Sequence, residues 1–315
     1  MTRPLIFPLP GNEMMAEKLG AALGGELGRF ETRRFPDEET YLRFATDPTG
    51  RSVALVCTLD RPNPKFLPLA FAAGAARDLG AGRVGVVAPY LPYMRQDKSF
   101  RPGEAVTSVI FARLLSSGID WLAAVDPHLH RYSRLDEIYS VETRVAHAAP
   151  LLAAWIKSNV SRPLLIGPDI ESEQWVAAVA GMADAPYRVL RKERRGDRDV
   201  RISVPDLHLF ADRVPVLVDD IVSTGRTMIE TARHLREQGL PAAVCMAVHA
   251  LFSEESYAKL NEIASAIVTT NAVPHHSNAI DVAPIIAQSI GDLVSNSGDL
   301  ANSERDVQLR GAKKE

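Results

Sequence analysis

The chain has 315 residues, of which 46% are hydrophobic and 24% are charged, and its formal net charge is -3. This composition is ordinary for a soluble globular protein and excludes disorder over most of the length. The near balance of acidic and basic residues argues against a protein that mainly coats nucleic acid or an anionic membrane. At roughly 150 residues per domain, the length predicts two domains.

The cysteines and the N-terminus restrict the class of protein further. Cys57 and Cys245 each lie inside an apolar run, so we expect two buried, reduced thiols in strands. Their number excludes a disulfide framework or a cysteine-based zinc site. The longest nearly apolar stretch, residues 66–76, is too short to span a bilayer, and the N-terminus has prolines where a secretory signal would be apolar. We therefore expect a cytoplasmic protein that binds neither nucleic acid nor membranes.

Apolar, β-branched runs alternate with helical periodicity along most of the chain, which predicts an α/β fold. The predicted elements of the first half are a strand at 52–59, a helix at 66–79 and a strand at 83–90. Those of the second half are a strand at 215–220, a helix at 227–238 and a strand at 242–251. The two series match loosely. An internal duplication and the general similarity of βαβ units both explain that match.

A domain boundary is predicted near residues 143–150, where a polar segment gives way to the helical segment APLLAAWIKS. We assign residues 1–145 to an N-terminal domain and residues 146–294 to a C-terminal domain. Residues 295–315 contain few large apolar side chains, and we expect them to form a disordered tail.

The most informative segment is VPVLVDDIVSTGRTMIETARHL at 214–235. An apolar strand ends at Asp219 and Asp220, and a helix begins near Thr227. Between them lie small polar residues, namely Ser223, Thr224 and Gly225. Backbone N–H groups and the helix dipole make such a junction a phosphate site, and paired carboxylates can hold sugar hydroxyls or, through water, Mg2+. The alternative is a tight turn whose Ser or Thr only caps the helix. The combination of features favours the phosphate site.

This segment resembles the phosphoribosyl diphosphate motif of the type I phosphoribosyltransferase fold. Two segments of the N-terminal half, RRFPDEETYLR at 33–43 and VVAPYLPYMRQDKSFRPGEAVTS at 86–108, resemble the ATP-site segments of ribose-phosphate diphosphokinases. Five separated segments occur in the expected order, and the resemblance runs from Gly11 to about Ala287. It implies two phosphoribosyltransferase-like domains, each with a mainly parallel sheet flanked by helices, and it accounts for the loose repeat.

For the first two segments, the resemblance implies a nucleotide site. Phe35 would stack on adenine, and Asp37 and Glu39 would accept hydrogen bonds from it or orient the loop. Arg95 is a fixed cation suited to ATP phosphates, and Gln96 offers both a donor and an acceptor to the nucleotide. Without the resemblance, Phe35 could equally be a core residue and the two carboxylates solvated turn residues. The family has Gly where this chain has Glu38.

Two further segments, AVDPHLHRYS at 124–133 and LLIGPDIESEQ at 164–174, follow predicted strands. The resemblance implies that His128 and Asp169 help to hold magnesium-ATP. His130 is two residues further on, so an extended backbone would place it on the same face as His128. A lone histidine after a strand is otherwise more often structural. The Gly-Gly pair usual after the family aspartate is absent, because Glu171 and Ser172 stand there.

The segment YRVLRKERRGDRDVRISVPD at 187–206 is a basic, solvated hairpin or loop by composition. The resemblance implies that its K-x-R pair, Lys192 and Arg194, opens a catalytic loop. Cations over a transferring phosphoryl group neutralise the charge that spreads over its oxygens.

The implied activity is transfer of the diphosphoryl group of Mg-ATP to the anomeric hydroxyl of ribose 5-phosphate, giving 5-phosphoribosyl 1-diphosphate and AMP. Residues 223–227 would bind the sugar's 5-phosphate, and Asp219 and Asp220 would hold the ribose 2- and 3-hydroxyls. The family also implies a homo-oligomer, a dimer or a hexamer, in which Phe35 of one subunit completes the ATP site of another. A nucleobase phosphoribosyltransferase and a non-catalytic regulatory subunit are the alternatives.

Arg226 is the clearest departure from the family, whose loop commonly has Gly or Cys followed by Gly before the last threonine. If Arg226 has ordinary helical φ in the first turn, the phosphate-binding N–H groups stay in place. Its guanidinium could instead fold over the phosphate, or the loop could be distorted and the site lost. We favour the first alternative because Thr227 and the following helix are intact.

Overall fold

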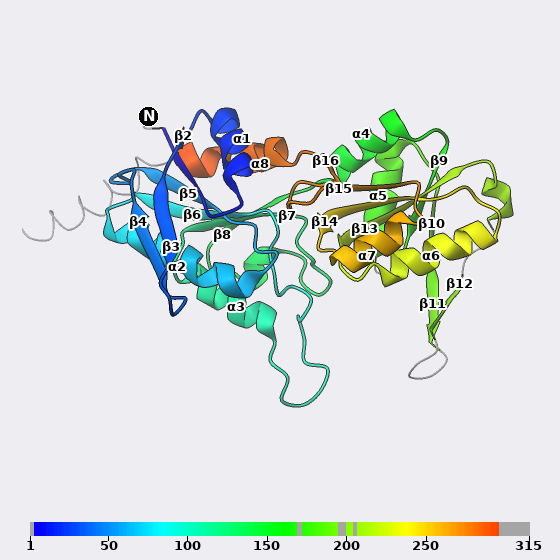
Figure 1. The fold of residues 1–315 in the computed structure, drawn as a ribbon, viewed down its shortest axis with the longest axis horizontal. Coiled ribbons are helices and arrows are strands. Elements are labelled where there is room, and N and C mark those ends of the chain that lie inside the picture. Colours follow the sequence, from blue (N-terminus) through cyan, green and yellow to red (C-terminus); the bar gives the residue numbers. More distant parts are fainter. Residues whose placement is uncertain (1–2, 169–171, 195–199, 204–206, 296–315) are drawn as a thin grey trace, which may run out of the picture. The chain divides into compact units, whose positions relative to one another are not determined.

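The structure is a computed structural model, and it describes residues 3–168, 172–194, 200–203 and 207–295. Contacts between residues divide the chain into two compact units (Figure 1). The first unit comprises Met1–Ala146 together with Ala283–Glu315, and the second comprises His147–Val282.

The first unit is built on a parallel six-stranded sheet in the order β2-β1-β5-β6-β7-β8. Its strands are β1 (Leu5–Pro8), β2 (Glu26–Leu27), β5 (Ser52–Val56), β6 (Arg83–Ala88), β7 (Trp121–Val125) and β8 (Glu142–Ala146). Strands β5 and β7 are buried along their whole length. That burial on both faces accounts for their uninterrupted apolar sequences, which are typical of parallel sheets covered by helices.

Helices cover both faces of this sheet. They are α1 (Glu13–Leu23), α2 (Pro62–Asp78), α3 (Thr107–Ser116) and α8 (Ala283–Ser295). Helices α1 and α8 lie together on one face, and α2 and α3 lie on the other (Figure 1). The core between α2, α3 and the sheet contains Leu55, Leu69, Val86 and Phe111.

An antiparallel hairpin, β3 (Phe30–Arg34) and β4 (Thr40–Phe44), stands apart from the sheet. Its inner face is fixed by three aromatic rings, because Phe30 and Phe44 pack against Phe7 of β1 with ring centroids 5.7 and 4.9 Å away. The hairpin therefore has a rigid base, while its turn projects into solvent.

The second unit repeats this plan. Its parallel sheet has the order β10-β9-β13-β14-β15-β16, and an antiparallel pair, β11 (Arg191–Arg194) and β12 (Val200–Ser203), takes the place of the β3–β4 hairpin. The sheet strands are β9 (Pro163–Gly167), β10 (Tyr187–Val189), β13 (Val214–Val222), β14 (Val244–Ala250), β15 (Ala266–Thr270) and β16 (Asn278–Ile280). The helices are α4 (Ala149–Asn159), α5 (Glu173–Ala183), α6 (Arg226–Glu237) and α7 (Glu254–Asn261). The shared strand order favours an internal duplication over a chance similarity.

Helix α8 belongs to the first unit, although it follows the second unit in the sequence. Residues up to 294 were assigned to the C-terminal domain by sequence, but α8 packs against α1, β7 and β8 of the first unit. Its buried residues Ile286, Ile290 and Leu293 provide the apolar face for this contact. Arg144 of β8 also pairs with Asp292 at 3.0 Å. An apolar helix can pack against any sheet face that is otherwise uncovered. Its position in the sequence therefore does not predict which sheet it covers.

Both cysteines are buried, as expected from their apolar surroundings. Cys245 lies within β14 and Cys57 directly follows β5, and neither forms a disulfide. Burial raises the pKa of each thiol to about 12, because the thiolate would lose its hydration. Within the described residues, the helices are too short or too polar to cross a bilayer.

Candidate active site

The end of β13 brings two carboxylates to the edge of the second sheet. Asp219 and Asp220 are half-buried, and β13 continues past them to Val222. The Asp219 carboxylate accepts a hydrogen bond from the Asp220 N–H at 3.0 Å, and the Asp220 carboxylate accepts one from the Ile221 N–H at 2.7 Å. The strand therefore orients both carboxylates through their neighbours' backbone.

The loop after β13 leads into the N-terminus of α6. Gly225 is the N-cap of this helix, with φ of 63°, and has no side chain that could accept a hydrogen bond from the first turn. The first turn of a helix has N–H groups without an intrahelical partner. The residue at the N-cap position is neither a Ser nor a Thr. Because the chain passes from β9 to β10 on one side and from β13 to β14 on the other, this loop lies at the sheet's topological switch point, where α/β folds bind ligands.

Arg226 is the first residue of α6 and is exposed. The left-handed conformation falls on the preceding residue, Gly225, and Arg226 is absent from the described non-glycine residues with positive φ. The backbone therefore follows the first of the three alternatives for Arg226. The helix begins one residue earlier than its sequence predicted, so Thr227 occupies its second position.

In the first unit, the corresponding switch point lies between β1 and β5 and is occupied by Asn12. This side chain is only 4% exposed. Its carbonyl accepts the Thr58 N–H at 2.7 Å, and its amide donates to the Leu9 carbonyl at 3.1 Å. The Thr58 N–H, a backbone donor of the kind that would face a ligand in a phosphate-binding junction, thus donates to Asn12 instead. The two units have diverged at this position.

Candidate residues of the first unit lie instead beyond β6 and β7, which are neighbours in its sheet. Two non-glycine residues there have left-handed backbone, Tyr93 with φ of 64° and Asp126 with φ of 31°. Such strain is uncommon and concentrates at functional sites. Asp126 directly follows β7 and lies two residues before His128, whereas Tyr93 lies two residues before Arg95 in the segment after β6.

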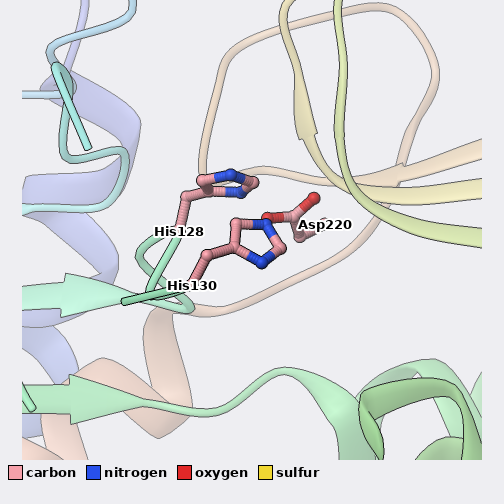
Figure 2. Close-up of side chains that lie close together, drawn as sticks. All are labelled: His128, His130 and Asp220. Carbon is pink, nitrogen blue, oxygen red and sulfur yellow. The ribbon is translucent and has the colours of Figure 1, made fainter. Parts of the chain in front are cut away.

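His128 and His130 lie side by side after β7, with ring centroids 3.8 Å apart and planes inclined by 73° (Figure 2). His128 is half-buried and His130 is exposed. The expectation that these two rings share a face is confirmed. Asp220, the third side chain labelled in that view, belongs to the second unit.

The loop after β6 holds Gln96 and leaves Arg95 exposed. The Gln96 side-chain carbonyl accepts a hydrogen bond from the Thr107 hydroxyl at 2.8 Å. Its amide group is therefore the part of the side chain suited to a ligand. Asp97 pairs with Arg131 at 3.3 Å, and the Lys98 ammonium lies 4.6 Å from the centre of the Phe100 ring.

The turn of the β3–β4 hairpin presents Phe35 to solvent. The Phe35 side chain is 38% exposed, which excludes the alternative that it is a core residue. Asp37 accepts the Glu39 N–H at 3.3 Å, so this carboxylate stabilises the turn. Glu38, at the family's glycine position, has φ of 70°. The backbone thus keeps the conformation that glycine would supply.

Two aromatic contacts in this hairpin were not found from the sequence. The Arg33 guanidinium lies 4.5 Å from the centre of both the Phe35 ring and the Tyr41 ring. The alternation of Arg33 with Phe35 was visible in the sequence. The pairing with Tyr41 required the register of the two strands.

The remaining candidates lie in or beside segments that the structure describes only in part. Lys192 and Arg194 are alternate residues of β11 and pair in register with Ile202 and Val200 of β12. Asp169, which follows the last residue of β9 by two positions in the sequence, lies outside the described residues.

Comparison with known proteins shows the family of this chain. A family model described as the N-terminal domain of ribose phosphate pyrophosphokinase matches residues 5–118, and one described as a phosphoribosyl transferase domain matches residues 134–284. A ribose-phosphate pyrophosphokinase of Sulfurisphaera tokodaii is 33% identical over 284 residues, covering 87% of this chain and 96% of the relative. The chain belongs to the ribose-phosphate pyrophosphokinase family.

Other relatives agree with this assignment. The ribose-phosphate pyrophosphokinase of Methanopyrus kandleri is 33% identical over 285 residues, covering 89% of this chain and 96% of the relative. The crystal structure of phosphoribosylpyrophosphate synthetase from Mycobacterium smegmatis matches with a TM-score of 0.82 at 21% identity, covering 94% of this chain and all of that chain. At that identity the structural match bears on the fold, which is two phosphoribosyltransferase-type domains with mainly parallel sheets.

Proposed function

We propose that this enzyme transfers the diphosphoryl group of Mg-ATP to the anomeric hydroxyl of ribose 5-phosphate, releasing AMP and forming 5-phosphoribosyl 1-diphosphate. The observation that carries the proposal is the junction after β13, where two oriented carboxylates precede a helix whose N-cap is a glycine. In a member of this family, that junction suits a sugar phosphate.

Ribose 5-phosphate is assigned to the second unit. The N–H groups at the start of α6, with Ser223, Thr224, Gly225 and Thr227, offer donors and partial positive charge to the 5-phosphate. Asp219 and Asp220 accept hydrogen bonds from the 2- and 3-hydroxyls of ribose. Arg226 lines the loop without being required for the phosphate contact.

ATP is assigned to residues of the first unit. Phe35 offers an exposed ring face to adenine, and Arg95 offers a fixed cation to the phosphates. Gln96 contributes its free amide donors, since its carbonyl is held by Thr107. Of the hairpin carboxylates, Asp37 acts mainly on the turn, and Glu39 is exposed and available to the nucleotide.

The chemistry of the donor set suits a magnesium ion only in part. Magnesium prefers oxygen ligands and keeps several waters, so the carboxylates of Asp219 and Asp220 fit better than the imidazole of His128. Asp169 would add a further carboxylate. When bound, magnesium neutralises charge on the diphosphoryl oxygens.

The transfer step needs alignment and charge neutralisation more than a base. The anomeric oxygen of ribose 5-phosphate attacks the β-phosphorus of ATP, the bond from that phosphorus to the α-phosphate oxygen breaks, and AMP leaves. Lys192 and Arg194 supply positive charge to the transferring group. A loose transition state needs little activation of the attacking hydroxyl, in keeping with the absence of a general base among our candidates.

Association with further copies of the chain is part of the proposal. Helices α2 and α3 touch through Phe66 and Phe111, whose ring centroids are 5.2 Å apart. Their outer surface carries four exposed large apolar side chains, Leu67, Phe71, Ile110 and Leu114. Exposed large apolar side chains on two touching helices suit an interaction surface. We assign it to a homo-oligomer, a dimer or a hexamer.

A coupled assay for AMP and 5-phosphoribosyl 1-diphosphate tests the activity. Purified protein with magnesium, ATP and ribose 5-phosphate is expected to form both products in equal amounts. Formation of neither indicates a regulatory subunit. A nucleobase phosphoribosyltransferase would instead consume 5-phosphoribosyl 1-diphosphate when a free base is supplied.

A further inference from the structure

The outer face of the β3–β4 hairpin carries a stack of three side chains beside its turn. The Arg33 guanidinium lies 4.5 Å from the centres of both the Phe35 and the Tyr41 rings. Arg33 and Tyr41 are directly opposed in the strand register, and Phe35 follows Arg33 by two residues, which places it on the same face. The two rings stand at 89° with centroids 6.3 Å apart.

The backbone beneath Phe35 is fixed as well. Its N–H donates to the Glu39 carbonyl at 2.8 Å, and its carbonyl accepts the Glu38 N–H at 2.9 Å. The opposite face of the hairpin packs on Phe7 through Phe30 and Phe44. The main source of freedom left to Phe35 is thus rotation of its side chain, which the Arg33 and Tyr41 contacts restrict.

We propose that Arg33 and Tyr41 are positioning residues that hold the Phe35 ring as a stacking platform for the adenine of ATP. This inference rests on the proposed function. The guanidinium covers one face of the ring, so the nucleobase stacks on the other. Because the ring is held before ATP arrives, the entropy cost of ordering an exposed aromatic side chain is not subtracted from nucleotide affinity.

The residue type at position 33 matters for this role. A planar guanidinium can stack on the face of one aromatic ring while its charge stays close to a second ring, whereas a lysine ammonium is a compact, strongly hydrated charge. Arg33→Lys therefore keeps the charge and loses part of the restraint. Arg33→Met keeps a long side chain and loses both the charge and the planar group.

Steady-state kinetics test the proposal. Arg33→Met is expected to raise the KM for ATP about fivefold, while kcat and the KM for ribose 5-phosphate stay within about twofold. Arg33→Lys should fall between this variant and the parent, and Tyr41→Leu should resemble Arg33→Met. Arg43→Met is the matched control, because Arg43 lies on the same face but pairs with Glu31 at 2.6 Å. It should leave the KM for ATP unchanged.

A double-mutant cycle separates positioning from direct contact. In a Phe35→Ala background, Arg33→Met should weaken ATP binding no further, since the ring it positions is gone. A further loss in that background would mean that Arg33 binds the nucleotide itself, and an unchanged KM in the single variant would mean that the ring needs no support. Either result overturns the proposal.

Calorimetric titration with ATP in the absence of ribose 5-phosphate makes this test independent of turnover. If the parent binds ATP and the variants weaken as expected but no 5-phosphoribosyl 1-diphosphate forms, the proposed function fails and the platform stands. If Arg33→Met binds ATP as tightly as the parent, the platform fails whatever the activity.

Discussion

Three of the five described non-glycine residues with positive φ lie close to candidate functional residues, whereas Arg162 and Asp184 do not. In the first unit, Glu38, Tyr93 and Asp126 all have positive φ, and each lies within two residues of a candidate ligand contact. In the second unit, the corresponding conformation at the α6 junction falls on Gly225, where it costs little. The loop that carries the most unusual side chain, Arg226, therefore has the less strained backbone.

We expect Glu38→Gly to stabilise the protein. A left-handed conformation costs a residue with a Cβ about 1–2 kcal/mol, and the greater flexibility of glycine in the unfolded chain offsets part of the gain. The free energy of unfolding should rise by about 0.5 to 1 kcal/mol, measured by denaturant titration. Glu39→Gly is the control, because Glu39 is absent from the described residues with positive φ, and it should destabilise. A loss of stability in Glu38→Gly would contradict the strain argument.

Arg226→Gly should change little in the binding of ribose 5-phosphate. Arg226 already has helical backbone, so glycine relieves no strain, and the N–H donors of the first turn remain. The KM for ribose 5-phosphate is expected within a few-fold of the parent. A hundredfold rise would show that the guanidinium binds the phosphate directly. A large gain in activity would show that the natural loop is impaired.

Lys192→Ala should lower kcat by about 100-fold or more while changing both KM values only a few-fold. A cation over the transferring group acts mostly on the transition state, so its loss appears in turnover. Arg191→Ala is the comparison, since Arg191 lies beside the K-x-R pair and outside it. Unchanged turnover in Lys192→Ala would remove this lysine from the mechanism.

The sequence predicted those helices and strands whose residue pattern follows from burial. The apolar runs of β5, β6 and β14 and the periodicity of α6 appear in the structure within a few residues of their predicted places. Strand β13 runs longer than predicted, to Val222, because its pairing with β14 continues beyond the two aspartates to Ile221 and His249. Ladder hydrogen bonds at the end of a sheet do not require apolar side chains, so no hydrophobic pattern reports them.

In the candidate site, too, local sequence features were predicted and contacts between distant residues were not. Residue types and order indicated the α6 junction, and the structure adds that its N-cap is Gly225 in the left-handed conformation. Long-range contacts were beyond reach from the sequence. Thr107 holds Gln96 from eleven residues away, and Tyr41 meets Arg33 across a strand pair. Such contacts depend on register and loop path, which periodicity within one segment does not encode.

The contact between β6 and β7 gives a prediction about packing. A Cβ added at Gly85 would lie 1.8 Å from the indole of Trp121, which is fully buried and paired with it in register. Gly85→Ala should therefore lower the free energy of unfolding by about 3 kcal/mol. Gly74→Ala in α2 is the control, because a Cβ there meets nothing within 4 Å, and it should stabilise the helix. Equal stability of Gly85→Ala and the parent in thermal or denaturant unfolding would contradict this account.

The two units share one sheet topology but differ in the residues at their switch points. The switch point of the second unit presents backbone donors at the start of α6, whereas Asn12 fills the corresponding place in the first unit. Candidate nucleotide contacts of the first unit come instead from its hairpin and from the segments after β6 and β7. On the proposed function, the duplicated fold binds the sugar phosphate in one half and the nucleotide in the other.

In the proposed homo-oligomer, mixed subunits can show which subunit supplies Phe35 to each ATP site. The ring stands exposed on a hairpin with a rigid base, as suits a group that reaches a neighbouring subunit's ATP site. Phe35→Ala and Lys192→Ala each damage one contribution to such a shared site. In dimers formed by mixing equal amounts of the two variants, half are mixed and each of these carries one intact site. About a quarter of the parental activity should then return. The measurement is the rate of AMP formation at subsaturating ATP after dissociation and reassociation, with each variant treated alone as the control. Activity equal to the mean of the two separate variants would show that each subunit builds its site from its own Phe35.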